Sequence, residues 1–212
     1  MSENNKHNAP RGRGRPSKSG RSLSETKQAL IQSGLAYFTE FGFSSSGIEQ
    51  VLKQAGVPKG SFYYYFESKE AFGLAVIDSY NRFFANKLDT HLLNDKVLPL
   101  QRLNNFVQDA KEGMSRYNFQ RGCLIGNLER EITLLSESYH QALNKVYAQW
   151  QKKVEQCLAL ALEQNLIRAT VNCESVAIFF WIGWEGAVSR SKLVKNTSPM
   201  DNFIENFFSL IS

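Results

Sequence analysis

The sequence predicts an all-α fold of about nine helices, with a small helical unit at the N-terminus and a larger helical domain after it. From residue 22 onward, apolar residues recur at intervals of three and four, and no segment shows the alternation of a half-buried strand. Helix-start signals stand at the heads of several segments, among them Ser22 with Glu25 and the prolines Pro99 and Pro199. With 42% hydrophobic residues among 212, the chain can bury a substantial core.

A first helix is expected from Ser22 to Gly42, and a short second helix follows it. Ser22 and Glu25 have the spacing of a capping box, in which each side chain accepts a hydrogen bond from the other residue's backbone N–H. Gly42 is expected to end this helix. The serines at 44–46 offer N-caps for a second helix that carries the apolar residues Ile48, Val51 and Leu52.

A tight turn separates the second helix from the third. Ala55-Gly56-Val57 supplies this turn, because glycine adopts a positive φ at no steric cost. Pro58 fits the first position of the third helix, where its missing N–H costs nothing. That helix is expected to run through residues 59–66, and Ser68 to cap a longer fourth helix.

The rest of the chain shows only helical periodicity. Apolar positions mark the fourth helix over 76–88, and Pro99 begins the fifth, which extends to Met114. The remaining helices are a short sixth over 124–132, a seventh over 139–161 with Asn165 in a left-handed C-terminal position, an eighth from about 174 to 194, and a ninth from Ser198-Pro199 to Ile211.

The excess positive charge is concentrated at the N-terminus. Residues 1–21 hold six basic residues and one acidic residue, so this arm accounts for the whole net charge of +5. Its core, Arg11-Gly12-Arg13-Gly14-Arg15-Pro16, resembles an AT-hook, in which thin, extended glycine-arginine chain lies in the minor groove. Two interpretations of the arm stay open: Arg11, Arg13 and Arg15 bind DNA, or the arm is a solubilising tail.

Several classes of protein are disfavoured. The longest apolar stretch, residues 176–184, is too short to span a membrane, and the polar N-terminus does not resemble a secretory signal. The three cysteines, Cys123, Cys157 and Cys173, form no close-spaced pair, so we expect neither a disulfide framework nor a metal site. A chain without disulfides suits a reducing compartment, so we expect a cytoplasmic location. Catalytic and nucleotide-binding motifs are absent from the sequence, so we expect no enzyme activity and no cofactor.

Two short helices joined by a glycine turn form a helix-turn-helix, whose second helix enters the major groove of DNA. Here that second helix is the one over 59–66, and it contains five aromatic residues. Helical spacing places Phe62 and Phe66 on one face, toward the core, and Tyr63 and Tyr64 on others, with their hydroxyls available to phosphates. The alternative, that the tyrosines only pack between helices, suits Tyr65 better than Tyr63.

The segment over residues 24–72 resembles the signature of the TetR family of transcriptional regulators. The resemblance rests on Gly42-Phe43, on the run from Ala55 to Phe66, and on the residues 68–72. Pro58 stands where the family commonly has serine. The resemblance implies DNA contacts from Ser45, Ser46, Lys59, Gly60, Ser61, Tyr63, Tyr64 and Lys69.

Arg121-Gly122-Cys123-Leu124-Ile125-Gly126-Asn127-Leu128 resembles a subgroup of this family that includes the N-ethylmaleimide-reductase repressor and the acrylate-utilisation regulator. This resemblance implies an inducer that is an electrophile or an unsaturated acid such as acrylate. A cysteine at a helix start beside Arg121 is expected to have a lowered pKa and to add to activated double bonds. The alternative is that Cys123, like Cys157 and Cys173, is a small buried hydrophobe.

The eighth helix is apolar almost all round, so it must be covered on two sides. Gly183, Gly186 and Ala187 would let another helix approach it. We therefore expect a homodimer formed by the segments near 174–194 and 199–211, with Phe203, Phe207 and Phe208 completing the interface. The residues expected to line a ligand pocket are Tyr117, Arg121, Cys123, Asn127, Arg130, Trp181, Trp184 and Glu185, although the tryptophans also suit core or dimer contacts.

Together these features predict a one-component repressor that binds operator DNA as a dimer and is released by a small molecule. The expected organisation is a basic arm over 1–21, a helix-turn-helix domain over 22–67 and a ligand-binding and dimerisation domain over 68–212. Two alternatives stay open, namely a ligand-independent architectural DNA-binding protein and a transcriptional activator.

Overall fold

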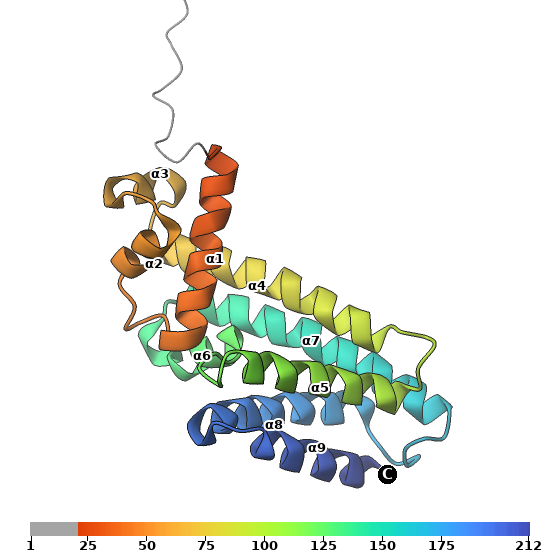
Figure 1. Cartoon of the computed structure of the whole chain (residues 1–212). Coiled ribbons are helices and arrows are strands. Elements are labelled where there is room, and N and C mark those ends of the chain that lie inside the picture. Colours follow the sequence, from red (N-terminus) through yellow and green to blue (C-terminus); the bar gives the residue numbers. More distant parts are fainter. Residues whose placement is uncertain (1–20) are drawn as a thin grey trace, which may run out of the picture.

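The computed structural model describes residues 21–212, and the secondary-structure elements in this part of the chain are all helices, joined by turns and loops (Figure 1). The prediction of an all-α fold is therefore confirmed for these residues. The helices are α1 (Leu23–Phe41), α2 (Ile48–Ala55), η1 (Lys59–Ser61), α3 (Phe62–Tyr65), α4 (Lys69–Leu92), α5 (Pro99–Arg116), α6 (Leu124–Arg130), η2 (Ile132–Leu134), α7 (Glu137–Glu163), α8 (Cys173–Val194) and α9 (Ser198–Ile211), where η denotes a 3₁₀ helix.

The caps of α1 are formed as the sequence predicts. The Ser22 hydroxyl accepts from the N–H of Glu25 at 3.2 Å, and the Glu25 carboxylate accepts from the N–H of Ser22 at 2.7 Å. Gly42 follows the last turn with a φ of 86°, and Gly56 makes the turn after α2 with a φ of 68°. Both glycines hold positive φ values that other residues rarely adopt, so these two turns are encoded locally.

Two predicted helix starts are wrong in detail. The serines at 44–46 do not cap α2, which begins after Gly47 without a side-chain cap. Instead, Ser45 and Ser46 donate their hydroxyls backward to the carbonyls of Phe41 and Gly42, where the end of α1 leaves acceptors unpaired. Pro58 is extended and precedes η1, because the tight turn at Gly56 is followed first by a 3₁₀ turn.

The sixth and seventh predicted helices also differ from expectation in part. Ile132 is not in α6, which ends at Arg130, but in the separate η2. Asn165 has the expected left-handed backbone, with a φ of 54°. Asn172 caps α8 by accepting from the N–H of Ser175 at 2.9 Å.

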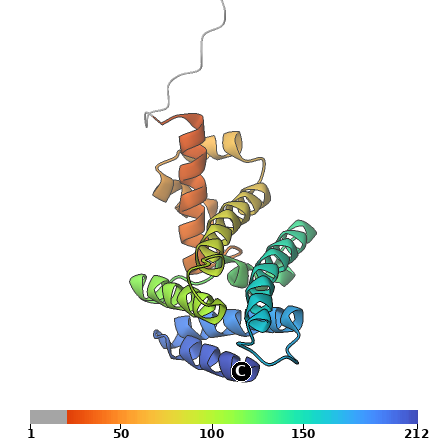
Figure 2. The same cartoon turned by 90° about the vertical axis from the view of Figure 1, so that its right-hand side faces the viewer.

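The helices form two units joined by α4. At one end of the molecule α1, α2 and α3 pack together, and α4 leads from them into the larger half (Figures 1 and 2). There α4, α5 and α7 lie against one another, and the pair α8 and α9 packs beneath them. Aromatic rings fill the centre of this half; Trp150 and Trp181 are fully buried with centroids 5.0 Å apart.

Several polar contacts between the two units are made at the end of α1. The Asn127 amide on α6 donates to the carbonyls of Phe38 and Thr39 at 3.3 and 3.0 Å. The Glu131 carboxylate accepts from the N–H groups of Phe43 and Ser44 at 3.1 and 2.6 Å. Polar groups of the larger half therefore satisfy the backbone where α1 ends, which fixes the small unit on the larger one.

None of the helices between residues 21 and 212 is both long enough and apolar enough to cross a lipid bilayer.

Candidate DNA-binding surface and ligand pocket

The third helix presents two tyrosines to solvent. Tyr63 and Tyr64 are 71% and 70% exposed, while Phe62 is 1% exposed and packs edge-on against Phe72. Two adjacent exposed phenol rings form a continuous aromatic patch, and such patches are typical of surfaces that bind a partner. Tyr65 is half-buried, in agreement with a packing role.

Lys59 and Gly60 lie beside these tyrosines at the N-terminal side of α3, and both are exposed. The Lys59 ammonium pairs with the Glu49 carboxylate on α2, and this contact raises the pKa of Lys59 and lowers that of Glu49. Both side chains are largely solvent-exposed, so the pair is weak and easily exchanged for a phosphate. No atom lies within 4 Å of a Cβ added at Gly60, so the surface beside this glycine is open.

The other residues expected to contact DNA are placed less favourably. Ser61 is half-buried, and Ser45 is exposed with its hydroxyl bound to Phe41. Ser46 is buried with its hydroxyl turned to Gly42, which contradicts its expected contact with DNA. Lys69 donates to the carbonyl of Phe43 at 3.0 Å and lies over the Phe43 ring, and burial lowers its pKa, so in this structure it anchors the start of α4.

The arginines Arg11, Arg13 and Arg15 lie outside the described residues. The described chain begins beside the helix-turn-helix, because the Arg21 guanidinium donates to the carbonyl of Ala55 at 3.1 Å. Arg21, the first described residue, therefore lies next to the turn that precedes the third helix.

A cavity of about 310 Å³ opens between α1, α4, α5, α8 and the segment before α6. Five of the residues predicted to bind a ligand line it: Tyr117, Arg121, Cys123, Trp184 and Glu185. Aromatic side chains from α4 complete the wall, and charged residues stand around it, which is the usual composition of a small-molecule site.

The innermost polar groups of this ligand pocket are Tyr80, Cys123 and Glu185, and all three are buried. The Tyr80 hydroxyl donates to the Cys123 sulfur at 3.6 Å. Burial, followed by the negative charge of Glu185, raises the pKa of the Cys123 thiol well above its ordinary value. The prediction of a lowered pKa is therefore wrong in this structure.

The reason for this correction is that Arg121 does not face the thiol. Its guanidinium stacks on the Tyr117 ring at 4.3 Å and lies 3.7 Å from the Glu40 carboxylate. The α6 helix has only seven residues, so its dipole offers little help to a thiolate. Any base that activates Cys123 must then come from the buried wall.

Glu185 is the buried acid of that wall. Its Oε2 atom has no hydrogen-bond partner, although the side chain is only 7% exposed. Burial raises its pKa to about 7, against smaller lowering effects of Cys123 and Arg130. An unpaired buried oxygen is costly, so a ligand that hydrogen-bonds to Glu185 gains more affinity than one that does not.

Glu185 gives stability a specific pH dependence. Its pKa is near 4.5 when unfolded and about 7 when folded, so between these values the folded state holds a proton that the unfolded state lacks. The free energy of unfolding is therefore expected to fall as pH rises from 4.5 to 7, by about 3 kcal/mol in total. Urea unfolding across this range measures the slope.

Glu185→Gln is expected to remove this component of the slope, because glutamine does not titrate. Glu112→Gln, at an exposed position on α5, is the matched control and is expected to leave the slope unchanged. Equal slopes for wild type and Glu185→Gln would show that Glu185 has an ordinary pKa.

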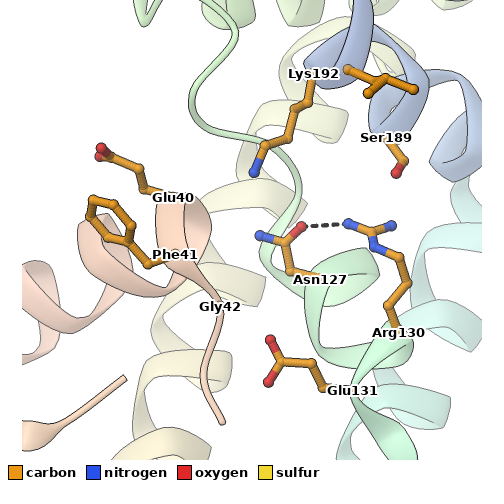
Figure 3. A pocket seen from close by; sticks show the side chains of 9 residues that line it. Glu40, Phe41, Gly42, Asn127, Arg130, Glu131, Ser189 and Lys192 are labelled. Atoms are coloured by element: carbon orange, nitrogen blue, oxygen red, sulfur yellow. Dashed lines mark hydrogen bonds between the residues drawn. The ribbon is translucent and has the colours of Figure 1, made fainter. Parts of the chain in front are cut away.

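Three predicted ligand residues do not reach the ligand pocket. Trp181 belongs to the buried aromatic core, next to Trp150. Asn127 and Arg130 instead line a second cavity between the two units (Figure 3), where the guanidinium donates to the Asn127 carbonyl oxygen at 2.5 Å. The prediction that Asn127 and Arg130 share a pocket with Cys123 was wrong, because their closeness in sequence does not show that α6 turns these two side chains toward α1. Conversely, Tyr80 was missed, since its helical stripe gave only a core signal.

One face of α8 is apolar and uncovered. Ile178, Phe179 and Ile182 are exposed, the last of them by 69%, and nothing lies within 4 Å of a Cβ added at Gly186. Gly183 has a different role from the one expected, since it admits the Phe203 ring of α9 from the same chain. Phe207 is likewise buried within the chain, so it does not belong to an external face of α9.

Within residues 21–212, no group of three or more histidine, cysteine, aspartate or glutamate side chains is arranged to hold a metal ion.

Two family models match the chain. One described as bacterial regulatory proteins, tetR family, covers residues 30–76, and one described as tetracyclin repressor-like, C-terminal domain, covers residues 99–207. The chain is similar to the transcriptional regulator AcuR of Cereibacter sphaeroides, with 43% identity over 195 residues that cover 92% of this chain and 89% of the relative. It is also similar to the HTH-type transcriptional repressor NemR of Escherichia coli K12, with 27% identity over 188 residues that cover 89% of this chain and 94% of the relative.

A solved structure gives the same picture. The crystal structure of regulatory protein TetR from Rhodobacter sphaeroides matches with a TM-score of 0.87 and 42% identity, and covers 90% of this chain and 100% of its own.

Proposed function

Because the chain belongs to the TetR family and is a transcriptional regulator, we propose that it is a repressor that binds operator DNA as a dimer and is released by a small electrophile or unsaturated acid. Membership confirms the resemblance seen over residues 24–72 and the prediction of a regulator instead of an enzyme. The observation that carries the proposal for the inducer is the ligand pocket, with Cys123 and Glu185 at its innermost wall.

The exposed face of α3 is the proposed reader of DNA. Tyr63 and Tyr64 supply hydroxyls for phosphates, and Lys59 supplies a positive charge once it leaves Glu49. Gly60 allows close approach to the DNA backbone, and Ser45 and Ser61 add short polar groups at its edge. Arg11, Arg13 and Arg15 are proposed to follow the minor groove beside it.

The uncovered apolar face of α8 is the proposed dimer interface. Ile178, Phe179 and Ile182 would lose water on association, and the open space at Gly186 lets a partner helix come close. A two-fold axis at this face supplies two copies of α3, as a palindromic operator requires. From α9 the exposed Leu210 is available to this interface, while Phe207 is not.

The proposed inducer reacts with Cys123 or hydrogen-bonds beside it. In a covalent response, the sulfur of Cys123 adds to the β-carbon of an activated double bond while the thiol proton passes to Glu185. The α-carbon of the adduct then takes this proton from Glu185, so that a thioether forms, Glu185 is regenerated and no oxidant is consumed. Glu185 is a suitable base because its pKa is about 7.

An acid such as acrylate also has a non-covalent route. Protonated Glu185 can donate a hydrogen bond to the ligand carboxylate, and Arg121 at the opening of the ligand pocket supplies positive charge. Tyr117 and Trp184 then provide the aromatic wall. The two routes differ in their dependence on the sulfur atom of Cys123.

Fluorescence anisotropy of labelled DNA from upstream of the protein's own gene tests the proposal. We expect saturable binding of two chains per site and release by acrylate or N-ethylmaleimide. Propionate, which has the carboxylate but lacks the double bond, is expected to release DNA only by the non-covalent route. Tight binding that neither compound relieves would favour the ligand-independent alternative, and inducer-strengthened binding would favour an activator.

A further inference from the structure

We propose that the cavity between the end of α1, α6 and the last turns of α8 is a second ligand site, and that it binds a small oxyanion between Arg130 and Lys192. The cavity measures about 420 Å³ and is separate from the ligand pocket that contains Cys123 (Figure 3). Its ligand is a carboxylate or phosphate group, since both present oxygens that a guanidinium and an ammonium bind together.

The two cations of this inter-unit cavity lack acidic partners within the described chain. Arg130 donates to the neutral amide of Asn127 at 2.5 Å, and Lys192 donates to the carbonyl of Thr39 at 3.3 Å. Neither residue takes part in an ion pair between residues 21 and 212. The Ser189 hydroxyl lines the same cavity and adds a further donor.

The two carboxylates of the cavity wall are engaged elsewhere. Glu131 accepts from the backbone N–H groups of Phe43 and Ser44, and Glu40 lies 3.7 Å from the Arg121 guanidinium. In Figure 3 the Glu40 carboxylate is turned away from Arg130. Neither acid forms an ion pair with Arg130 or Lys192; the charge of Glu40 acts on Lys192 only as the smallest of the influences on its pKa, after burial and Arg130. The space between these cations therefore favours an anion from solution.

The cations also repel each other. Burial, and after it the positive charge of Arg130, lowers the pKa of Lys192, so the two groups are close enough to interact. The stem of Lys192 packs closely against Gly122, since a Cβ added there would lie only 3.0 Å from the lysine Cδ atom. A bound oxyanion would relieve this repulsion without any large movement of the lysine.

The position of the cavity gives such an anion a route to DNA binding. Lys192 and Asn127 both bond to carbonyls at the end of α1, the helix that carries the DNA-binding unit. An anion held by Arg130 and Lys192 would therefore act on the same contacts that fix the small unit on the larger half. This role is independent of the inducer proposed for the ligand pocket.

Isothermal titration calorimetry of the full chain without DNA tests the site, with sodium phosphate and sodium propionate as separate titrants at constant ionic strength in chloride. Propionate has no double bond, so it does not react with Cys123. We expect saturable binding of at least one of the two, weakened by about tenfold or more in Arg130→Gln and in Lys192→Gln. Lys192→Arg, which keeps the charge, is expected to retain binding.

One control separates this site from other positive charges of the surface. Arg190→Gln removes an exposed positive charge from the same helix and is expected to bind both anions as wild type does. Binding of phosphate alone or propionate alone would support the site and identify the preferred oxyanion. Absence of saturable heat with both, or equal affinity in Arg130→Gln, Lys192→Gln and wild type, would overturn the proposal.

Discussion

Cys123→Ser is expected to abolish release of operator DNA by N-ethylmaleimide and to leave operator affinity unchanged. The serine hydroxyl is a far weaker nucleophile, so the required electrophile concentration should rise by about a hundredfold or more. Operator affinity should not change, because Cys123 lies in the wall of the ligand pocket and away from α3. Anisotropy of the bound operator during titration with N-ethylmaleimide gives both quantities.

The other two cysteines are the controls. Cys157 is buried with a pKa raised to about 11, and Cys173 is partly exposed at the start of α8. Cys157→Ser and Cys173→Ser are both expected to respond to N-ethylmaleimide as wild type does, and peptide mass spectrometry then shows which sulfur carries the adduct. Full induction of Cys123→Ser would reduce Cys123 to a packing residue.

Glu185→Gln distinguishes how the thiol is activated. If Glu185 takes the thiol proton, the rate of alkylation of Cys123 should rise with pH around 7 in wild type. In Glu185→Gln this rise around pH 7 should be absent. An identical pH profile in both proteins would mean that another base acts, and it would leave the role of Cys123 itself unaffected. Retained release by acrylate in Cys123→Ser would support the non-covalent route.

The helix ends and turns of the N-terminal unit could be predicted from the sequence because their signals are local. The capping box at Ser22 and the turns at Gly42 and Gly56 depend only on nearby residues, and the structure reproduces all three. The serines before α2 show the limit of such reasoning. Ser46 can satisfy either the start of α2 or the end of α1, and the burial that decides between them is a tertiary property.

The ligand pocket could be predicted only in part, because it too depends on tertiary contacts. Cys123 and Glu185 could be singled out as a thiol and an acid in apolar segments, but their mutual effect on pKa depends on α6 and α8 meeting in space. Arg121 shows the reverse case, in which two residues are close in sequence but do not interact. It is two residues from Cys123, yet its guanidinium stacks on Tyr117 and faces Glu40. Adjacent positions did not imply adjacent charges.

Lys59→Ala and Tyr63→Phe are expected to weaken operator binding without lowering the melting temperature. Each removes one phosphate or base contact per chain, worth roughly 1–2 kcal/mol, so a dimer loses two contacts and affinity falls by roughly 30- to 1000-fold. Stability should not change, because Tyr63 is 71% exposed and the ion pair of Lys59 with Glu49 is itself exposed. Anisotropy of the operator complex and thermal unfolding of the free protein measure the two effects.

The salt dependence separates the two side chains. Lys59 carries a charge that displaces counterions, so Lys59→Ala should flatten the plot of log affinity against log salt by about one unit per chain, while Tyr63→Phe should leave the slope unchanged. Lys53→Ala, at an exposed position on α2, is the matched control for loss of a positive charge. Its effect on operator affinity and on the salt slope should be smaller than that of Lys59→Ala. Wild-type affinity in both Lys59→Ala and Tyr63→Phe would remove the exposed face of α3 as the reader, because the proposal assigns a DNA contact to each of these side chains.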